Sequence, residues 1–297
     1  MITTASAARQ PINRGNGTRS GLAWLLVAFY IGSVILFISI YVEGVEDHFI
    51  NRFSNIYLII PLLGGLHTLS RLIPVRALIR NSYRVTVAAF SVGLLLWSIG
   101  CTIWMYLIFK YSHAQIPYPS MADAFYALCF IAWTVGLLNL YKTAGKNVLH
   151  EINNSTARFL VPLWAVVVSL IYLKHGSGLS AYASKTALLK LGLDIFFLMI
   201  DLLNLGLLIT LLPSTENEKL GLSGTSLKII SLGYFFLCLA SSSFTICSSL
   251  PDDSPYHYYN GGFTDFMFAT AFTVIGIGLA SILVEGDNTR EIAGSTT

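Results

Sequence analysis

The chain has 297 residues, of which 55% are hydrophobic and 11% are charged, and its mean hydropathy is +0.68. Soluble domains carry about 25% charged residues, so this composition excludes an ordinary soluble protein and indicates an integral membrane protein in contact with a lipid bilayer. The formal net charge of +3 is small, and no long basic run is present, so no nucleic-acid partner is expected.

Eight apolar segments are close to the length of about 17 to 25 residues that a helix needs to cross a bilayer. Helices are the expected form, because a helix pairs its own backbone polar groups in lipid. In chain order the segments are 21–42, 56–72, 85–109, 121–141, 159–173, 187–212, 226–250 and 262–284. The sequence therefore predicts an all-α integral membrane protein with eight transmembrane helices.

The distribution of Lys and Arg predicts the orientation of these helices. With a cytoplasmic N-terminus, 13 basic residues fall on the inner side and 5 on the outer side, as the positive-inside rule requires. The basic loop 174–190 on the outer side argues against this orientation. The first apolar segment is too long for the core of a signal peptide. We expect a retained first helix, both termini in the cytoplasm, and a location in the plasma (inner) membrane.

Two of the segments share a pattern that indicates an internal repeat. Asp123 and Gly136 are 13 residues apart, and so are Asp265 and Gly278. Each of these segments follows another long apolar segment and closes a helical hairpin with it. We expect two parallel four-helix repeats related by an axis along the membrane normal. The expected divisions are a cytoplasmic tail 1–20, a first repeat 21–141, a cytoplasmic connection 142–158, a second repeat 159–284 and a cytoplasmic tail 285–297.

The two repeated aspartates have two interpretations. Ser120 and Asp123 form an S-x-x-D signal for a helix start, where a carboxylate stabilises the first turn. The alternative is a ligand site at the outer ends of the helices, where carboxylate, imidazole and phenol groups can bind a cation, a proton or a small polar ligand. The candidate residues for that site are Asp123, Asp265, His113, His257 and Tyr118.

The sixth apolar segment carries polar residues on one helical face, because their spacings are 4, 7 and 3 residues: Lys190, Asp194, Asp201 and Asn204. An aspartate near the bilayer centre costs about 2.5 to 3.5 kcal/mol, so a partner inside the bundle is expected. Lys190 is the expected partner of Asp194. Candidate partners of Asp201 are His67, Asn204 and the serines 241–243. Asp201 either fastens helices together or forms a proton- or ligand-sensing site.

Motifs for catalysis and metal binding are missing from the sequence. The cysteines lie inside predicted helices without a C-x-x-C pair, and no H-E-x-x-H motif occurs. His67 is the only histidine well inside a predicted span, which disfavours haem held by two histidines, and the last segment lacks a central lysine for retinal. We therefore expect no enzyme and no metal site, and an intramembrane enzyme or haem protein ranks third among the function classes.

The run Pro119–Tyr126 reads P-S-M-A-D-A-F-Y and is followed by Gly136. It resembles the P-S-x-A-D-x-x-Y signature in the multi-pass N-terminal membrane sensor regions of bacterial diguanylate cyclases and related signalling proteins. Gly262, Asp265 and Gly278 resemble the second repeat of those regions. The resemblance implies an input module for a cytoplasmic enzyme. Because only 13 residues follow Val284, the output is expected from a cytoplasmic or membrane signalling partner chain.

These observations favour a membrane sensor or ligand-binding input module without its own catalytic domain. The alternative is a small-solute or proton-coupled transporter, because parallel repeats and an aspartate near the membrane centre are typical of carriers.

Overall fold

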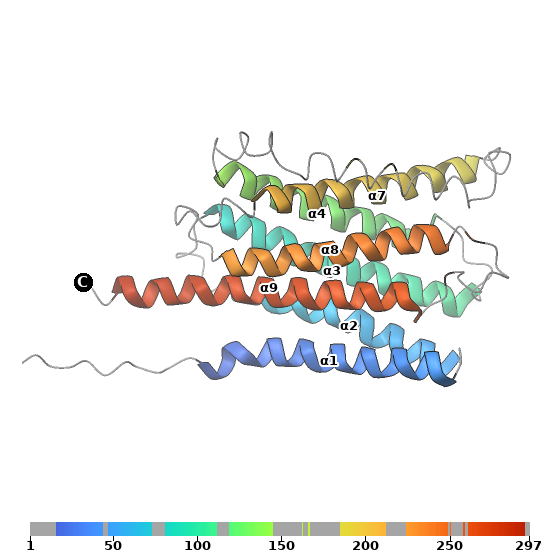
Figure 1. Ribbon diagram of the computed structural model, residues 1–297, viewed down its shortest axis with the longest axis horizontal. Coiled ribbons are helices and arrows are strands. Elements are labelled where there is room, and N and C mark those ends of the chain that lie inside the picture. The colour runs from blue at the N-terminus through green and yellow to red at the C-terminus, as the bar shows by residue number, and fades with distance from the viewer. Residues whose placement is uncertain are drawn as a thin grey trace, which may run out of the picture.

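The computed structural model describes residues 16–43, 47–72, 81–111, 119–144, 185–211, 224–248 and 261–294, together with residues 162, 166, 250 and 258. Regular secondary structure in these ranges is entirely α-helical, which confirms the all-α prediction. The helices, labelled as in Figure 1, are α1 (Asn16–Glu43), α2 (Asp47–Leu72), α3 (Asn81–Tyr111), α4 (Met121–Ala144), α7 (Lys185–Leu211), α8 (Gly224–Cys247) and α9 (Phe263–Gly294).

Seven of the eight predicted spans coincide with these helices, and the fifth, at 159–173, falls outside the described ranges apart from residues 162 and 166. Six described helices are long and apolar enough to cross a membrane: Gly21–Val42, Arg84–Tyr111, Met121–Lys142, Leu188–Leu211, Thr225–Cys247 and Phe263–Ile282. α2 is not among the six, although it packs within the bundle against α1, α3 and α9. The chain is therefore a multi-pass integral membrane protein.

The helices lie side by side in one bundle (Figure 1). The most extensive contacts join α3 to α4 and α8 to α9, and α7 packs against α4 and α8. α1 begins and α9 ends at the same end of the bundle (Figure 1). This arrangement agrees with two termini on one side of the membrane, and the assignment of that side to the cytoplasm stays a prediction.

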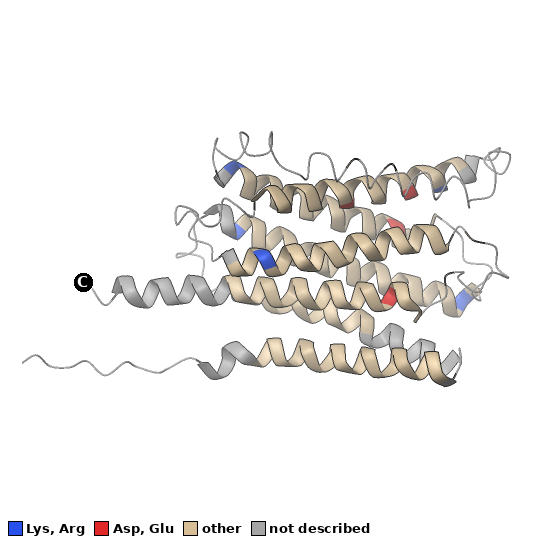
Figure 2. Cartoon of the chain, viewed as in Figure 1, with Lys and Arg blue, Asp and Glu red and all other residues tan. Residues whose placement is uncertain are grey.

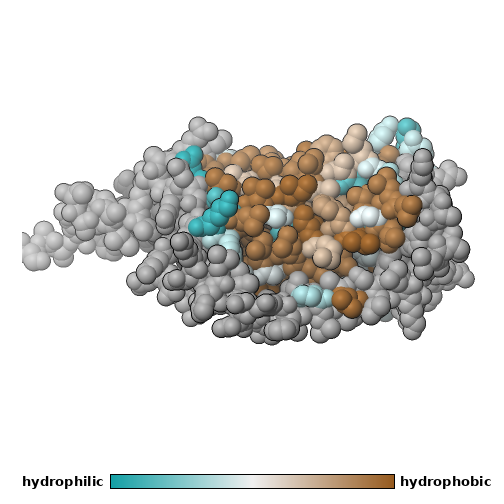
Figure 3. Space-filling model, turned by 90° about the horizontal axis from the view of Figure 1, so that it is seen from above, coloured by the Kyte–Doolittle hydropathy of each residue, from teal (hydrophilic) through white to brown (hydrophobic). Residues whose placement is uncertain are grey.

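The outer surface of the bundle suits lipid. Large apolar side chains such as Ile31, Leu128, Val135, Met199 and Leu232 are exposed, and Figure 3 shows a broad apolar belt with hydrophilic residues toward its two ends. The coloured Lys and Arg residues of Figure 2 lie near the two ends of the bundle. An apolar surface of this extent is stable in hydrocarbon and is a liability in water.

Glycines allow the paired helices to approach closely. In the α3–α4 pair, a β-carbon on Gly93 would overlap the indole of Trp133 on α4. In the α8–α9 pair, a β-carbon on Gly233 would lie 2.7 Å from a side-chain carbon of Ile275 on α9. Both pairs therefore depend on a glycine in the first helix that faces a large side chain of the second.

Candidate functional site

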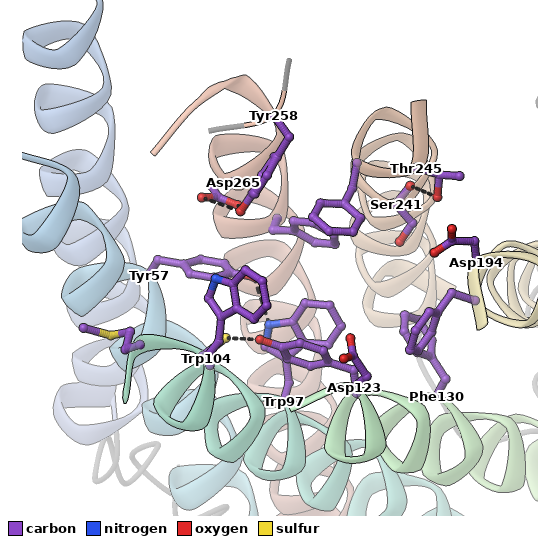
Figure 4. A pocket seen from close by; sticks show the side chains of 16 residues that line it. Tyr57, Trp97, Trp104, Asp123, Phe130, Asp194, Ser241, Thr245, Tyr258 and Asp265 are labelled. Carbon is purple, nitrogen blue, oxygen red and sulfur yellow. Dashed lines mark hydrogen bonds between the residues drawn. The ribbon is translucent and has the colours of Figure 1, made fainter. Parts of the chain in front are cut away.

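A cavity of about 110 Å³ lies among α2, α3, α4, α7, α8 and α9, at the end of the bundle where α4 and α9 begin. One water needs roughly 10 to 15 Å³ of such space, so the cavity has room for several waters or one small organic molecule. Figure 4 shows its side chains converging on a common space. Apart from aromatic and acidic residues, the lining consists of Cys101, Met105, Ser241 and Thr245.

Nine of the lining residues are aromatic: Tyr57, Trp97, Trp104, Tyr126, Phe130, Phe197, Phe244, Tyr258 and Phe268. Trp97 packs against several of them: its ring centroid is 4.5 Å from that of Tyr126 and 5.2 Å from that of Phe268. Its indole N–H donates a hydrogen bond to the Tyr57 hydroxyl at 2.9 Å. These contacts hold the rings in fixed orientations, so the aromatic wall is a packed part of the bundle.

Three carboxylates line the same cavity: Asp123 from α4, Asp194 from α7 and Asp265 from α9 (Figure 4). Their side chains are 7%, 5% and 6% exposed, respectively. Asp123 lies close enough to Asp194 for the two to interact electrostatically. Among the described residues that line the cavity there is no Lys, Arg or His. The described lining of the cavity therefore carries three acidic side chains and no basic one.

Asp123 is the third residue of α4 and closes its first turn. Its Oδ2 atom accepts hydrogen bonds from the backbone N–H of Ser120 at 2.6 Å and from the Ser120 hydroxyl at 2.8 Å. This geometry confirms the helix-start interpretation of the S-x-x-D signal. Both bonds end on Oδ2 and neither uses Oδ1. The same side chain also forms part of the cavity wall.

Asp265 is the third residue of α9 and has an equivalent arrangement. Its Oδ2 accepts the backbone N–H of Gly261 at 2.8 Å, and the Tyr258 hydroxyl donates to its Oδ1 and Oδ2 at 3.1 and 3.3 Å. Gly261 has a φ of 79°, a conformation that glycine adopts without strain. Burial and the neighbouring Asp265 raise the pKa of the Tyr258 hydroxyl, which therefore remains a donor. Capping and cavity lining thus occur together at both aspartates.

No protein-family model, curated protein or solved structure matches this chain. The helices themselves show which class of protein this is. The chain is a multi-pass helical membrane protein. The likeness of its Asp123 region to bacterial sensor regions remains a prediction from the sequence.

The polar residues predicted on one face of the sixth segment lie on α7, and three of them have different surroundings. Asp194 lines the cavity. Asn204 joins three helices, with its Oδ1 2.8 Å from the Thr134 hydroxyl of α4 and its Nδ2 donating to the Tyr234 hydroxyl of α8 at 3.1 Å. Asp201 is 0% exposed, and neither of its carboxyl oxygens has a hydrogen-bond partner among the described residues. The Ser241 side chain of α8 faces Asp201.

The remaining predicted site residues lie elsewhere. Lys190 is one turn before Asp194 on α7, and His67 is partly exposed on α2; neither is among the residues that line the cavity. His113, Tyr118 and His257 lie outside the described residues. The described part of the chain contains no group of three His, Cys, Asp or Glu residues arranged to hold a metal ion.

Loss of the cap at α4 provides a test of the structural role of Asp123. Replacing Asp123 with alanine is expected to cost about 1 kcal/mol of stability, because two donors at the helix start lose their acceptor. Asp123→Asn keeps one acceptor oxygen and is expected to cost less than half of that. Thermal unfolding of the purified protein in detergent measures both values. Equal losses in the two variants would contradict the capping role.

Proposed function

We propose that this protein is a ligand-binding module of the membrane that passes the bound state to a partner chain. The observation that carries the proposal is that Asp123 and Asp265, each at a helix start, line one aromatic-walled cavity. A cavity with largely apolar walls and a few converging polar groups is the usual form of a small-molecule site. The chain itself supplies the binding function and no catalytic step in this proposal.

The lining residues also support the proposed duplication, because most of them form pairs at nearly constant separation. Four pairs are 140 residues apart, namely Tyr57 with Phe197, Cys101 with Ser241, Trp104 with Phe244 and Met105 with Thr245. Two pairs are 142 residues apart, namely Asp123 with Asp265 and Tyr126 with Phe268. Such pairing is expected if the cavity lies on the axis between two related halves.

Packing and sequence point to the same relation between the halves. Gly93 faces Trp133 and Gly233 faces Ile275, and these contacts link positions that are again 140 and 142 residues apart. Residues 57–63 read YLIIPLL and residues 197–203 read FLMIDLL. A ligand between two such halves contacts both of them. Its binding energy can therefore favour one arrangement of the halves over another, which is the requirement for a sensor.

A proton-coupled carrier is the second candidate, and Asp201 is the observation that favours it. A fully buried carboxyl without a described hydrogen-bond partner, in the middle of a predicted span, has the surroundings typical of a proton site. Under this proposal Asp201→Asn abolishes proton-driven uptake into liposomes and leaves ligand affinity unchanged. Ligand binding without uptake by the unaltered protein favours the sensor.

Tryptophan fluorescence tests the binding proposal directly, because Trp97 and Trp104 line the cavity. Titration with a panel of cationic, neutral and anionic metabolites is expected to change the emission for at least one member. The double variant Trp97→Phe, Trp104→Phe should lose that signal. Trp24→Phe should keep it, since Trp24 is 69% exposed on α1.

The two aspartates are expected to contribute to the affinity for that ligand. Asp123→Asn combined with Asp265→Asn should weaken binding about 10-fold or more, because a hydrogen bond to a charged group contributes about 1.5 to 3 kcal/mol. Unchanged affinity in the double variant, or an emission change that survives loss of both cavity tryptophans, would contradict the proposed site.

A further inference from the structure

The chemistry of the cavity wall selects a class of ligand. Asp123, Asp194 and Asp265 are each more than nine-tenths buried and line one cavity. Charges act strongly on one another where water is scarce, and Asp123 and Asp194 are close enough to interact electrostatically. Carboxylates in such a wall attract a bound positive charge. They repel a bound anion, and the described lining offers no basic side chain to attract one.

The hydrogen bonds at the two capping aspartates indicate that both carboxyl groups act as acceptors. Asp123 accepts from Ser120, and Asp265 accepts from Gly261 and Tyr258. Every one of these contacts is satisfied by an ionised carboxylate and none requires a proton on it. The hydrogen bonds of both groups are therefore compatible with a negatively charged carboxylate at the wall of the cavity.

The aromatic wall distinguishes an organic cation from a metal ion. Faces of Trp and Tyr rings attract ammonium groups by about 0.5 to 2 kcal/mol each, with the larger values at desolvated sites. Trp97 and Tyr126 lie with their centroids 4.5 Å apart, and Phe268 is 5.2 Å from Trp97. A small metal ion instead needs several oxygen ligands in a tight shell, and the described residues contain no group of three that could hold one.

We propose that the cavity binds an organic ammonium ion, with its charged group beside the aspartates of the lining and its carbon atoms against the rings of Trp97, Tyr126 and Phe268. This inference rests on the proposed function of the cavity as a ligand site. An ammonium group of this kind is carried by free amines and by the headgroups of some phospholipids, and the shared chemistry is the positively charged nitrogen with its alkyl substituents.

The test compares choline with 3,3-dimethylbutan-1-ol, which has the same shape without the charge. The full chain is placed in nanodiscs of phosphatidylglycerol, which lacks an ammonium group, and binding is followed by tryptophan fluorescence and calorimetry. Choline is expected to bind at least 10-fold more tightly than the neutral alcohol. A second preparation with added phosphatidylcholine identifies the source: competition by this lipid indicates a headgroup ligand, and unchanged choline binding indicates a free amine.

Variants test the contributions of the acidic side chains and of the aromatic rings to choline binding separately. Asp194→Asn should weaken choline binding about 10-fold, whereas Asp201→Asn, on the same helix but outside the lining, should leave it unchanged. Tyr126→Leu should weaken binding, and Tyr126→Phe, which keeps the ring, should restore it. Unchanged binding in both Asp194→Asn and Tyr126→Leu overturns the placement of the ligand.

Two results overturn the ammonium inference and leave the ligand-binding proposal standing. One is equal affinity for choline and the neutral alcohol. The other is no response to choline while a neutral or anionic compound produces a signal that depends on Trp97 and Trp104. If no compound of any charge produces such a signal, both the ammonium inference and the ligand-binding proposal fail.

Discussion

Gly93→Ala is expected to destabilise the bundle by about 2 to 3 kcal/mol, because overpacking a rigid core is costly. The new β-carbon would overlap the indole of Trp133 and lie 2.5 Å from its Cδ1 atom. The indole cannot easily move, since its N–H donates to the Phe90 carbonyl at 3.0 Å and its ring packs 5.4 Å from that of Tyr234. Thermal unfolding in detergent measures the loss.

Gly192→Ala is the matched control for this substitution. Gly192 is also inside a helix, and a β-carbon there meets nothing within 4 Å, so alanine is expected to stabilise by about 0.5 to 1 kcal/mol. Adding Trp133→Leu to Gly93→Ala should remove the overlap, so the double variant should lose less stability than the two separate losses combined. Similar unfolding midpoints for Gly93→Ala and Gly192→Ala would contradict the close contact between α3 and α4.

Asp201→Leu is expected to stabilise the protein by about 1 to 2 kcal/mol, because it removes a buried polar group that has no described hydrogen bond. Leucine has the same branched arrangement of four side-chain heavy atoms, so the change mainly replaces two oxygens by methyl groups. Both oxygens of Asp201 lack a partner in the described part of the chain, and the side chain is fully buried. Denaturation in detergent compares the variant with the unaltered protein.

Asn204→Leu is the matched comparison, three residues along the same helix. It makes the same change in shape but breaks the contacts with Thr134 and Tyr234, so a loss of about 1 to 2 kcal/mol is expected. Opposite signs for the two variants would identify Asp201 as a position retained for activity at the expense of stability. A loss of stability in Asp201→Leu would instead indicate a structural bond at that carboxyl.

The helices were largely predictable because each apolar segment has the length of a span. The start of α4 at Met121 was predicted from the S-x-x-D signal, and the Ser120 bonds confirm it. The end of α9 was less predictable. The apolar segment was expected to end at Val284, whereas the helix continues to Gly294. Hydropathy marks where lipid contact ends, and a helix can continue beyond that point into polar sequence.

The site was predictable only in part. Asp123 and Asp265 were identified from the sequence because their spacing to a following glycine repeats, and Asp194 because it lies on a polar face of an apolar segment. The rings of Trp97 and Phe197 were not, since aromatic residues are common in spans and helical periodicity does not show which neighbour each one faces. The likeness of residues 57–63 to 197–203 was a usable signal, because it extends the repeat to the helices that supply those rings.

The length of α9 has a mechanical consequence for a cavity at its first turn. The helix runs without a break from Phe263 to Gly294 (Figure 1). Its 32 residues correspond to about 48 Å at about 1.5 Å per residue, compared with about 30 Å of hydrocarbon. A tilt of about 5° pivoting at Asp265 displaces the far end of a rod of that length by about 4 Å. α9 can therefore act as a lever that carries a small movement at one membrane face to the opposite face.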